Sequence, residues 1–300
     1  MGERGDGFTA GRVELSAGPI HYVESGEGEP LVFVHGFGVN GRLWTDTAAA
    51  LASGHRCIVP DWPLGSHPEP MRPDADLTPP GVARLIAEFI AELDLEGVTV
   101  VGNDSGGALA QILVTEHPKR IARMVLTNCD LFEKFPPKAF QPLVRLCRLP
   151  GARFAFARGL QLRAVRRSPL TYGALTMDPI DDELLRAWAD PQAASAGVGR
   201  DGLRFFGSVD NRYTLEAARK LADLELPALL VWGAEDRFFT IEDARRMERT
   251  IPDCRLVAIP DARTFVPLDQ PAAVAEAIER FMAERPIAAS AAAQSAAPLA

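Results

Sequence analysis

Long apolar runs, cysteine and histidine are all scarce in this chain of 300 residues. No run of eighteen apolar residues occurs, so we expect no transmembrane helix, and the polar N-terminal residues lack the apolar core of a signal peptide. The four cysteines show no metal-ligand spacing. We therefore predict reduced thiols in a cytoplasmic protein, without a metal site. The net charge of −8 argues against a nucleic-acid or anionic-membrane partner. Of the five histidines, none follows residue 117.

Apolar runs alternate with helical patterns along most of the chain, which predicts an α/β fold with a doubly wound, mostly parallel sheet. The predicted strands form a hairpin at 13–23 and single runs at 31–34, 57–60, 98–101, 121–128, 227–232 and 255–259. The predicted helices cover 43–51, 81–95, 105–116, 241–250 and 272–284.

The alternation stops between residues 131 and 212, where the pattern is helical and rich in arginine and aromatic residues. We interpret this segment as a helical cap inserted over a main domain made of residues 11–130 and 213–285. Its apolar residues predict a mostly apolar pocket for a small organic substrate. The alanine-rich tail at 286–300 is expected to be disordered.

The segment Val100-Val101-Gly102-Asn103-Asp104-Ser105-Gly106-Gly107 follows a predicted strand and opens a predicted helix. This context is typical of a nucleophile elbow, a strained turn that needs small residues two positions before and after the nucleophile. Only Asp104 has glycine on both sides, at 102 and 106, so we predict Asp104 as the nucleophile. Ser105 as the nucleophile, or an ordinary glycine-rich turn, remains an alternative.

From residue 12 to residue 284, the chain resembles the α/β-hydrolase superfamily. The resemblance rests on Leu31–Val34 leading into His35-Gly36-Phe37-Gly38, on Asp61, on the 102–106 turn, on Trp232-Gly233-Ala234-Glu235-Asp236, and on Phe265-Val266-Pro267-Leu268-Asp269-Gln270-Pro271. An aspartate on the elbow is similar to the epoxide hydrolase and haloalkane dehalogenase branch. That resemblance implies a carboxylate nucleophile, an alkyl-ester intermediate, and hydrolysis of this ester by water that a histidine activates.

The resemblance also assigns roles around the nucleophile. The segment His35-Gly36-Phe37 resembles the turn in which the backbone N–H after the glycine forms half of an oxyanion hole, and the Ser105 N–H would form the other half. His35 is expected to hold this loop in place rather than to transfer protons. Asp236 is the expected acid of the catalytic triad. Asp130, which follows the preceding strand, is the alternative acid.

The chain departs from the family pattern at Thr264, which stands where the catalytic histidine belongs. Threonine has no pKa near neutrality and cannot act as a general base. Three hypotheses follow. His67, on the loop after the 57–60 strand, activates the water; or Asp104 is the general acid and base of an isomerase, lyase or cyclase; or the protein binds a ligand without catalysis.

The substrate is expected to be a small, largely apolar molecule, and no cofactor is predicted. Ser105 follows Asp104 where the resemblance leads us to expect tryptophan, which weakens the dehalogenase alternative. Tyr172 and Tyr213 are candidates for the two tyrosines with which epoxide hydrolases protonate the epoxide oxygen, and this favours epoxide chemistry. Trp62, Thr264 and Phe265 are further candidates for the pocket wall. A homodimer is left open.

Overall fold

Eight strands form one sheet in the computed structural model, which describes residues 7–149 and 151–287. The strands are β1 (Thr9–Leu15), β2 (Gly18–Ser25), β3 (Glu29–Val34), β4 (His55–Pro60), β5 (Val98–Asp104), β6 (Ile121–Cys129), β7 (Ala228–Gly233) and β8 (Cys254–Ile259). Their order is β1-β2-β4-β3-β5-β6-β7-β8. The first two pairings are antiparallel and all the others are parallel. The predicted mostly parallel sheet is confirmed.

The N-terminal hairpin is longer than its pattern indicated. β1 begins at Thr9, ahead of the predicted domain start at residue 11, because its pairing with β2 extends to Thr9 opposite Glu24. The predicted tail at 286–300 lies largely outside the described residues, which end at 287. No helix within the described ranges is long and apolar enough to cross a membrane.

Helices cover both faces of the sheet, and each face has its own hydrophobic cluster. Four helices pack on one face: α2 (Pro79–Glu92), α3 (Ser105–Glu116), α9 (Asn211–Leu221) and α10 (Ile241–Thr250). The other face carries η1 (Gly41–Trp44), α1 (Thr45–Leu51), α11 (Val266–Asp269) and α12 (Pro271–Glu284). This two-sided covering explains why β3 and β5 read as continuous apolar runs, since both of their faces are buried.

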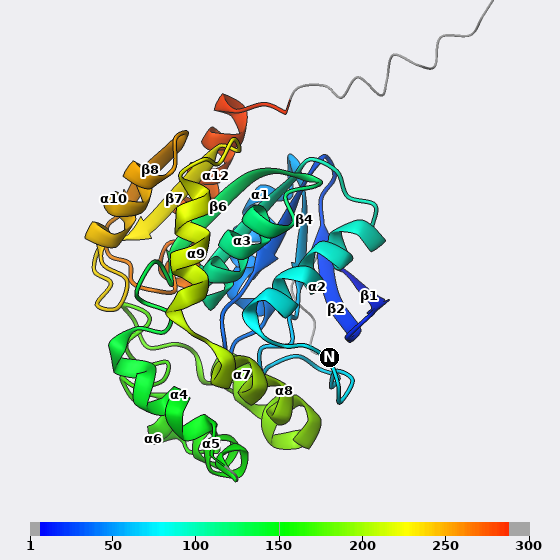
Figure 1. Cartoon of the computed structure of the whole chain (residues 1–300), viewed down its shortest axis with the longest axis vertical. Helices are drawn as coiled ribbons and strands as arrows, with labels where there is room; N and C mark the ends of the chain where they lie inside the picture. The colour runs from blue at the N-terminus through cyan, green and yellow to red at the C-terminus, as the bar shows by residue number, and fades with distance from the viewer. Residues whose placement is uncertain (1–6, 150, 288–300) are drawn as a thin grey trace, which may run out of the picture.

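The remaining helices lie together at one end of the molecule, at the bottom of Figure 1. They are η2 (Lys138–Phe140), α4 (Gln141–Cys147), α5 (Ala152–Gln161), α6 (Arg163–Arg166), α7 (Asp182–Ala194) and α8 (Ala196–Ser208), and we call α4 to α8 the cap helices. The chain returns to the sheet at α9, which packs against α3. Side chains from α5 and α8 share a pocket with residues at the carboxyl ends of β5 and β6. In open α/β sheets, ligands bind at this edge.

Candidate active site

Asp104 occupies the sharp turn between β5 and α3. Its backbone has φ 54° and ψ −132°, a region that residues with a side chain rarely adopt. Glycine is required on both sides: a Cβ on Gly102 would lie 2.7 Å from the carbonyl oxygen of Gly106, and one on Gly106 would lie 2.3 Å from that of Val34. Ser105 is the first residue of α3. The strained residue of the turn is therefore Asp104.

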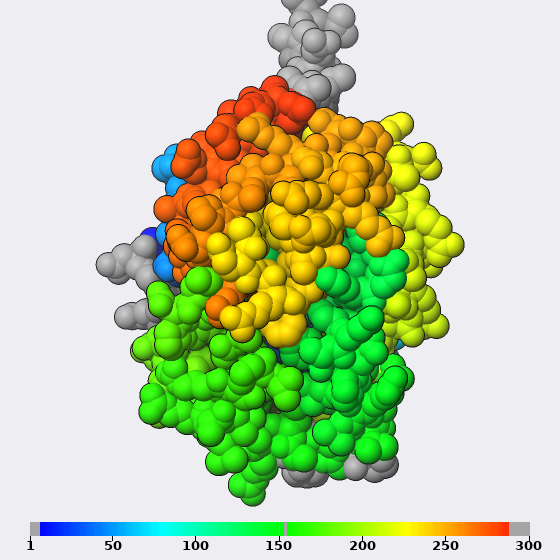
Figure 2. Space-filling model, turned by 90° about the vertical axis from the view of Figure 1, so that its left-hand side faces the viewer, coloured from blue at the N-terminus to red at the C-terminus, as the bar shows by residue number. Residues whose placement is uncertain are grey.

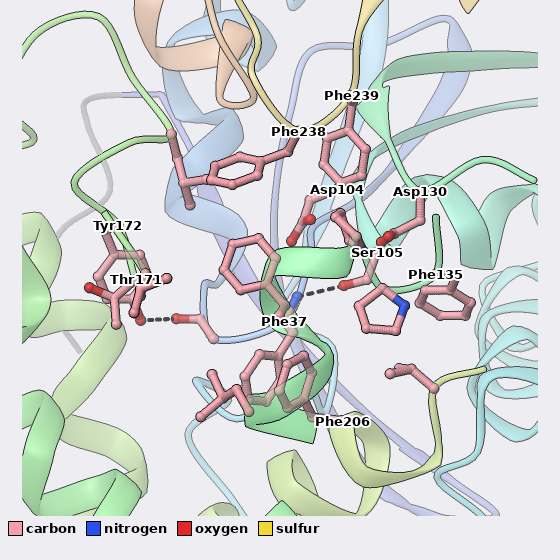
Figure 3. Close-up of a pocket in the computed structure, with 18 of the residues that line it drawn as sticks. Phe37, Asp104, Ser105, Asp130, Phe135, Thr171, Tyr172, Phe206, Phe238 and Phe239 are labelled. Carbon is pink, nitrogen blue, oxygen red and sulfur yellow. Dashed lines mark hydrogen bonds between the residues drawn. The ribbon is translucent and has the colours of Figure 1, made fainter. Parts of the chain in front are cut away.

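The Asp104 carboxyl lies against the loop that follows β3. A Cβ on Gly36 would come within 2.1 Å of Asp104 Oδ2, so only glycine fits at this position. The carboxyl also lines a pocket with about 760 Å³ of atom-free space, part of which is open to solvent. Figure 3 shows aromatic side chains from the cap and the main domain surrounding Asp104. The wall is largely apolar; its members include Phe37, Phe135, Phe140, Phe156, Leu160, Phe206, Val209, Phe238 and Phe239.

Asp130, directly after β6, puts a second carboxyl into the same pocket, beside Ser105 in Figure 3. Its backbone N–H donates to the carbonyl oxygen of Asp104 at 3.3 Å, which holds the two residues side by side. No lysine, arginine or histidine is found among the described residues that line this pocket. Two carboxyls therefore line one pocket whose described wall supplies no neutralising cation.

Burial sets the protonation of this pair. It raises the pKa of Asp104 to about 7, opposed by the backbone N–H of Ser105 and reinforced by the charge of Asp236. Burial, and then the charge of Asp104, raise the pKa of Asp130 well above its usual range. Asp130 Oδ1 has no hydrogen-bond partner among the described residues, whereas the Asp104 anion gains the Ser105 N–H. The Ser105 N–H therefore favours the anion of Asp104, and Asp130 Oδ1 has no comparable donor among the described residues.

Asp236 follows β7 and is almost completely buried. Its Oδ1 accepts hydrogen bonds from the backbone N–H groups of Phe238 at 2.7 Å and Phe239 at 3.1 Å, and its Oδ2 accepts one from Asn128 Nδ2 at 2.9 Å. Burial raises the pKa of Asp236, and these donors oppose the rise. The carboxyl also lies close enough to Asp104 for its charge to raise the pKa of Asp104.

Thr264 is fully buried next to Asp236. Its hydroxyl lies near enough to the Asp236 carboxyl to lower the pKa of Asp236. Yet its Oγ1 makes no hydrogen bond of normal geometry to a described residue. The carbonyl oxygen of Thr264 accepts a 2.7 Å hydrogen bond from Asn103 Nδ2, so the loop is tied to the turn that carries Asp104. The position predicted from the family pattern therefore does face the predicted acid, but with a hydroxyl in place of an imidazole.

The loop His35-Gly36-Phe37 lies beside the Asp104 turn. The backbone N–H of Trp62 donates to His35 Nε2 at 2.8 Å, so the proton of this ring is on Nδ1, which faces the carbonyl oxygen of Gly36 at 2.9 Å. Both ring nitrogens are therefore occupied by backbone groups. The backbone N–H of Phe37 donates to Ser105 Oγ at 2.8 Å (Figure 3). One expected oxyanion-hole donor is thus engaged by a hydroxyl of the chain itself.

His67 is not among the residues that line the Asp104 pocket. Its ring is buried against α8, with Nε2 3.4 Å from Asp201 Oδ2, and its Nδ1 has no partner among the described residues. Asp201 also accepts from the backbone N–H of Met71 at 2.7 Å and pairs with Arg200. His67 therefore joins the loop after β4 to the cap, and the structure does not bring this candidate base to Asp104.

Of the candidate wall residues, Tyr172 lines the pocket, and its Oη donates to the carbonyl oxygen of Gly38 at 2.6 Å (Figure 3). Burial raises the pKa of its phenol. Tyr213 lies instead on α9, where its Oη accepts from Arg212. Trp62 is buried in the core, with Nε1 donating to the carbonyl oxygen of Phe33, and Phe265 packs edge-on against Trp188. The structure therefore brings one of the two candidate tyrosines to the pocket.

Two asparagines contribute to the site without having been singled out in the sequence. Asn103 Nδ2 donates to the hydroxyl of Thr127 and to the carbonyl oxygens of Asn128 and Thr264. Asn128 accepts from the N–H of Gly233 at 2.6 Å and donates to the Asp236 carboxyl. Asn128 ends a predicted apolar strand and Asn103 directly precedes Asp104 in the predicted turn. An amide next to a buried strand is a signal that could have identified them, because buried polar side chains require partners.

Comparison with known proteins agrees with this architecture. The family model described as "alpha/beta hydrolase fold" matches residues 29–271. "Haloalkane dehalogenase 2" of Mycobacterium tuberculosis is 30% identical over 291 residues, covering 89% of this chain and 93% of that protein. The "Cis-3-alkyl-4-alkyloxetan-2-one decarboxylase" of Shewanella oneidensis is 26% identical, covering 88% and 85%. The solved structure "Epoxide hydrolase CorEH without ligand" superposes with a TM-score of 0.78 at 20% identity, covering 92% and 99%.

Proposed function

Since the chain belongs to the alpha/beta hydrolase fold family, we propose that it is a cofactor-independent hydrolase that opens epoxides of small, largely apolar molecules. Asp104 is the nucleophile in this proposal, and Asp130 is both the proton donor and the proton acceptor. The observation that carries the proposal is the pair of carboxyls in one apolar pocket whose described lining includes no basic side chain. Such a pair keeps one proton in the pocket and leaves one anion.

In the first step, an Asp104 oxygen attacks an epoxide carbon and the carbon–oxygen bond of the ring breaks. The departing alkoxide takes the proton of Asp130. The products of this step are a hydroxyalkyl ester on Asp104 and an ionised Asp130. Because esterification removes the negative charge of Asp104, the Asp130 carboxylate no longer faces a like charge.

In the second step, the Asp130 carboxylate takes a proton from water as the water oxygen attacks Cγ of the Asp104 ester. The tetrahedral intermediate collapses, the bond between Cγ and the alkyl oxygen breaks, and that oxygen leaves with the proton from Asp130 as the second hydroxyl of a diol. Asp104 is left as a carboxyl group that shares one proton with Asp130, which restores the starting state. One residue thus serves as acid and then as base, as a carboxyl does in retaining glycosidases.

The chemistry of the leaving group determines whether the site is better suited to an epoxide or to a haloalkane substrate. A departing alkoxide needs a proton, which Asp130 holds, whereas a halide needs N–H donors arranged around it. Ser105 follows Asp104, no tryptophan is found among the described lining residues, and the Phe37 N–H already donates to Ser105. Tyr172 donates its proton to Gly38, which leaves Asp130 as the better placed acid. These features favour oxygen over halide as the leaving atom.

A single turnover in ¹⁸O-labelled water tests the proposal. With enzyme in excess over a panel of aryl and alkyl epoxides, ¹⁸O should appear in the Asp104 carboxyl, found by mass spectrometry of its peptide, and be absent from the diol. Label in the diol after one turnover would show direct attack by water and overturn the nucleophile role. No turnover of any epoxide in the panel would overturn the substrate class. Asp104→Asn should form neither ester nor diol.

A second candidate function is supported by the hydrogen bond from the Phe37 N–H to Ser105 Oγ, which occupies a donor that a tetrahedral oxyanion would need. An isomerase or lyase that uses Asp104 and Asp130 only to move protons does not form such an oxyanion. A decarboxylase stands among the relatives of the chain. The same labelling separates the two functions, because this alternative places ¹⁸O in neither Asp104 nor the product while Asp104→Asn still abolishes turnover.

A further inference from the structure

Charge is strongly segregated along the chain. From Lys134 to Met177 there are nine basic residues and no acidic residue. The net charge of −8 is therefore the sum of +9 on this segment and −17 on the rest of the chain. The basic segment spans η2 and the cap helices α4, α5 and α6. One end of an acidic protein is thus strongly basic.

The same segment carries exposed apolar side chains. All of the exposed large hydrophobic side chains among the described residues lie in it: Leu146, Leu149, Leu162, Leu170 and Met177 are 50%, 58%, 61%, 62% and 37% exposed. Scattered single exposures are ordinary on a protein surface, but their confinement to one basic segment is not. Basic and apolar side chains combined on short helices are typical of a surface that lies on a membrane interface.

Several of the basic side chains have no acidic partner. Lys138, Arg145 and Arg158 form no ion pair with any described residue, and Arg148 donates only to the carbonyl oxygen of Gly207. Arg163 and Arg167, in contrast, both pair with Asp182. The unpaired cations are concentrated around α4 and α5, where Leu146 and Leu149 are also exposed. Their charge is therefore available to an external partner.

This surface meets the mouth of the pocket. Leu170 is both exposed and part of the pocket wall. A polar groove lined by Arg145 and Arg148 adjoins the pocket and shares Phe135, Pro136 and Val209 with it. Figure 2 shows the green surface of the cap filling the lower half of the face in view, below the yellow, orange and red C-terminal elements.

We propose that the basic, leucine-bearing surface of η2 and α4 to α6 docks on anionic phospholipid membranes. Phosphates and carboxylates of the headgroups pair with the unpaired arginines and Lys138, and the exposed leucines enter the acyl boundary. A second copy packed through the same surface would bring like charges together. Nucleic acid would offer no apolar region for the leucines. The remainder of the chain, at −17, is repelled by the membrane and orients the cap towards it.

Docking also indicates how the substrate reaches the pocket, and this step rests on the proposed function. Apolar epoxides partition into a bilayer, and a pocket whose mouth includes Leu170 would take them directly from it. The substrate class then extends to lipophilic epoxides of the kind formed by oxidation of unsaturated acyl chains. The enzyme would consume the product of an alkene-oxidising reaction.

Co-sedimentation of the full chain with vesicles tests the docking. Binding is expected to vesicles of phosphatidylcholine mixed with phosphatidylserine and not to phosphatidylcholine alone, and to weaken at high ionic strength. Arg145→Glu combined with Arg158→Glu should reduce binding by at least about twentyfold, since each cation near an anionic surface contributes about fivefold. The matched control, Arg249→Glu combined with Arg280→Glu on α10 and α12, should bind like the wild type. Leu146→Ser combined with Leu149→Ser should also weaken binding.

Equal binding by the cap and control variants, or no binding to the anionic vesicles, overturns the proposal. Binding to heparin or DNA that matches vesicle binding and ignores the leucine substitutions also overturns it, in favour of a soluble polyanion. Turnover of a water-soluble epoxide in the absence of vesicles is measured separately for each variant and should be unchanged by the arginine substitutions. A failure of docking therefore leaves the catalytic proposal standing, and a failure of catalysis leaves the vesicle result standing.

Discussion

The backbone N–H of Phe37 donates a 2.8 Å hydrogen bond to the Oγ of Ser105, the residue that follows the strained Asp104. The family resemblance assigns this N–H to an oxyanion hole, but here the chain supplies the acceptor itself. A substrate oxyanion can use the Phe37 N–H only after the Ser105 side chain turns away. In the structure, one donor of the proposed oxyanion hole is therefore already occupied by a side chain of the protein itself.

Ser105→Ala should free the Phe37 N–H and speed the hydrolysis of the Asp104 ester. One intramolecular hydrogen bond contributes about 0.5–1.5 kcal/mol, so kcat should rise by about two- to tenfold where ester hydrolysis limits the rate. Steady-state and single-turnover kinetics with one epoxide measure the change. Ser105→Thr, which keeps the hydroxyl, is the control and should stay near the wild-type rate. A loss of activity in Ser105→Ala would instead make the Ser105 hydroxyl a donor to substrate.

Asp130→Asn should trap the ester on Asp104. The amide has no acid proton for the departing alkoxide and cannot act as a base, so ester formation slows and ester hydrolysis slows further. Intact-mass spectrometry after incubation with an epoxide should show a stable adduct equal to the mass of the epoxide, located on Asp104. Asp130→Glu should restore part of the turnover. Wild-type turnover without any adduct in Asp130→Asn would remove Asp130 from the mechanism.

Burial of the carboxyl pair should make the fold less stable as pH rises. The pKa of Asp104 is raised from 3.8 to about 7, so the folded state keeps a proton that the unfolded chain releases above pH 4. The stabilising effect of this proton is fully present below pH 4 and is lost as pH rises through about 7. The melting temperature of Asp104→Asn should therefore match that of the wild type near pH 4 and exceed it near pH 8. The difference should be about 2–4 °C for each kcal/mol by which the buried carboxylate destabilises the wild-type fold.

The exposed Asp74 provides the control for this pH effect, because Asp74→Asn makes the same chemical change on the surface. Thermal melts of both variants across pH 4 to 8, with the wild type alongside, give the comparison. A melting difference for Asp104→Asn that stays constant with pH would contradict the buried pair as its cause. We expect Asp104→Asn to stabilise the fold because functional sites retain groups that lower the stability of the fold.

The sheet could be predicted from the sequence because each buried strand reads as a short apolar run bounded by turn residues. The 102–106 glycines likewise follow from local sterics, since a Cβ at either position meets backbone atoms. The proximity of Asp104 to Asp130 could not be predicted in the same way. Both residues end adjacent parallel strands, but sequence spacing does not reveal that a backbone hydrogen bond joins them or that the wall around them holds no cation.

The distribution of charge and the direction of side chains are two features that the sequence arguments did not capture. The net charge of −8 is a sum over the whole chain, and it does not describe the segment from Lys134 to Met177, which holds nine basic residues and no acidic residue. His67 and Tyr213 are candidates only through their place along the chain. In the structure, His67 packs against Asp201 and the Tyr213 hydroxyl accepts from Arg212. Which way a loop or cap side chain points depends on tertiary contacts, which local patterns do not encode.

His67→Gln should lower stability while leaving the chemistry intact. The His67 ring is buried between the loop after β4 and α8, so its replacement should cost about 1–3 kcal/mol and lower the melting temperature. Asp201→Asn should have a similar effect on melting. The kcat of folded His67→Gln should be near the wild-type value. A large fall in kcat without a change in melting temperature would restore His67 as the base that activates water.

Thr264→His provides the sharpest test of the missing base. The position is fully buried beside the Asp236 carboxyl, and its hydroxyl has no hydrogen-bond partner among the described residues, so an imidazole there would gain a carboxylate partner. The larger ring should lower the free energy of unfolding by about 1–3 kcal/mol through overpacking. Ester hydrolysis should nevertheless accelerate by about 10²-fold, with a new pH dependence near 6.5, because a positioned imidazole is an effective general base.

Single-turnover rates and the decay of the adduct in the Asp130→Asn background measure the gain. Thr264→Gln is the control of similar bulk without a base, and equal rates for the two variants would show that residue 264 does not reach the reacting water.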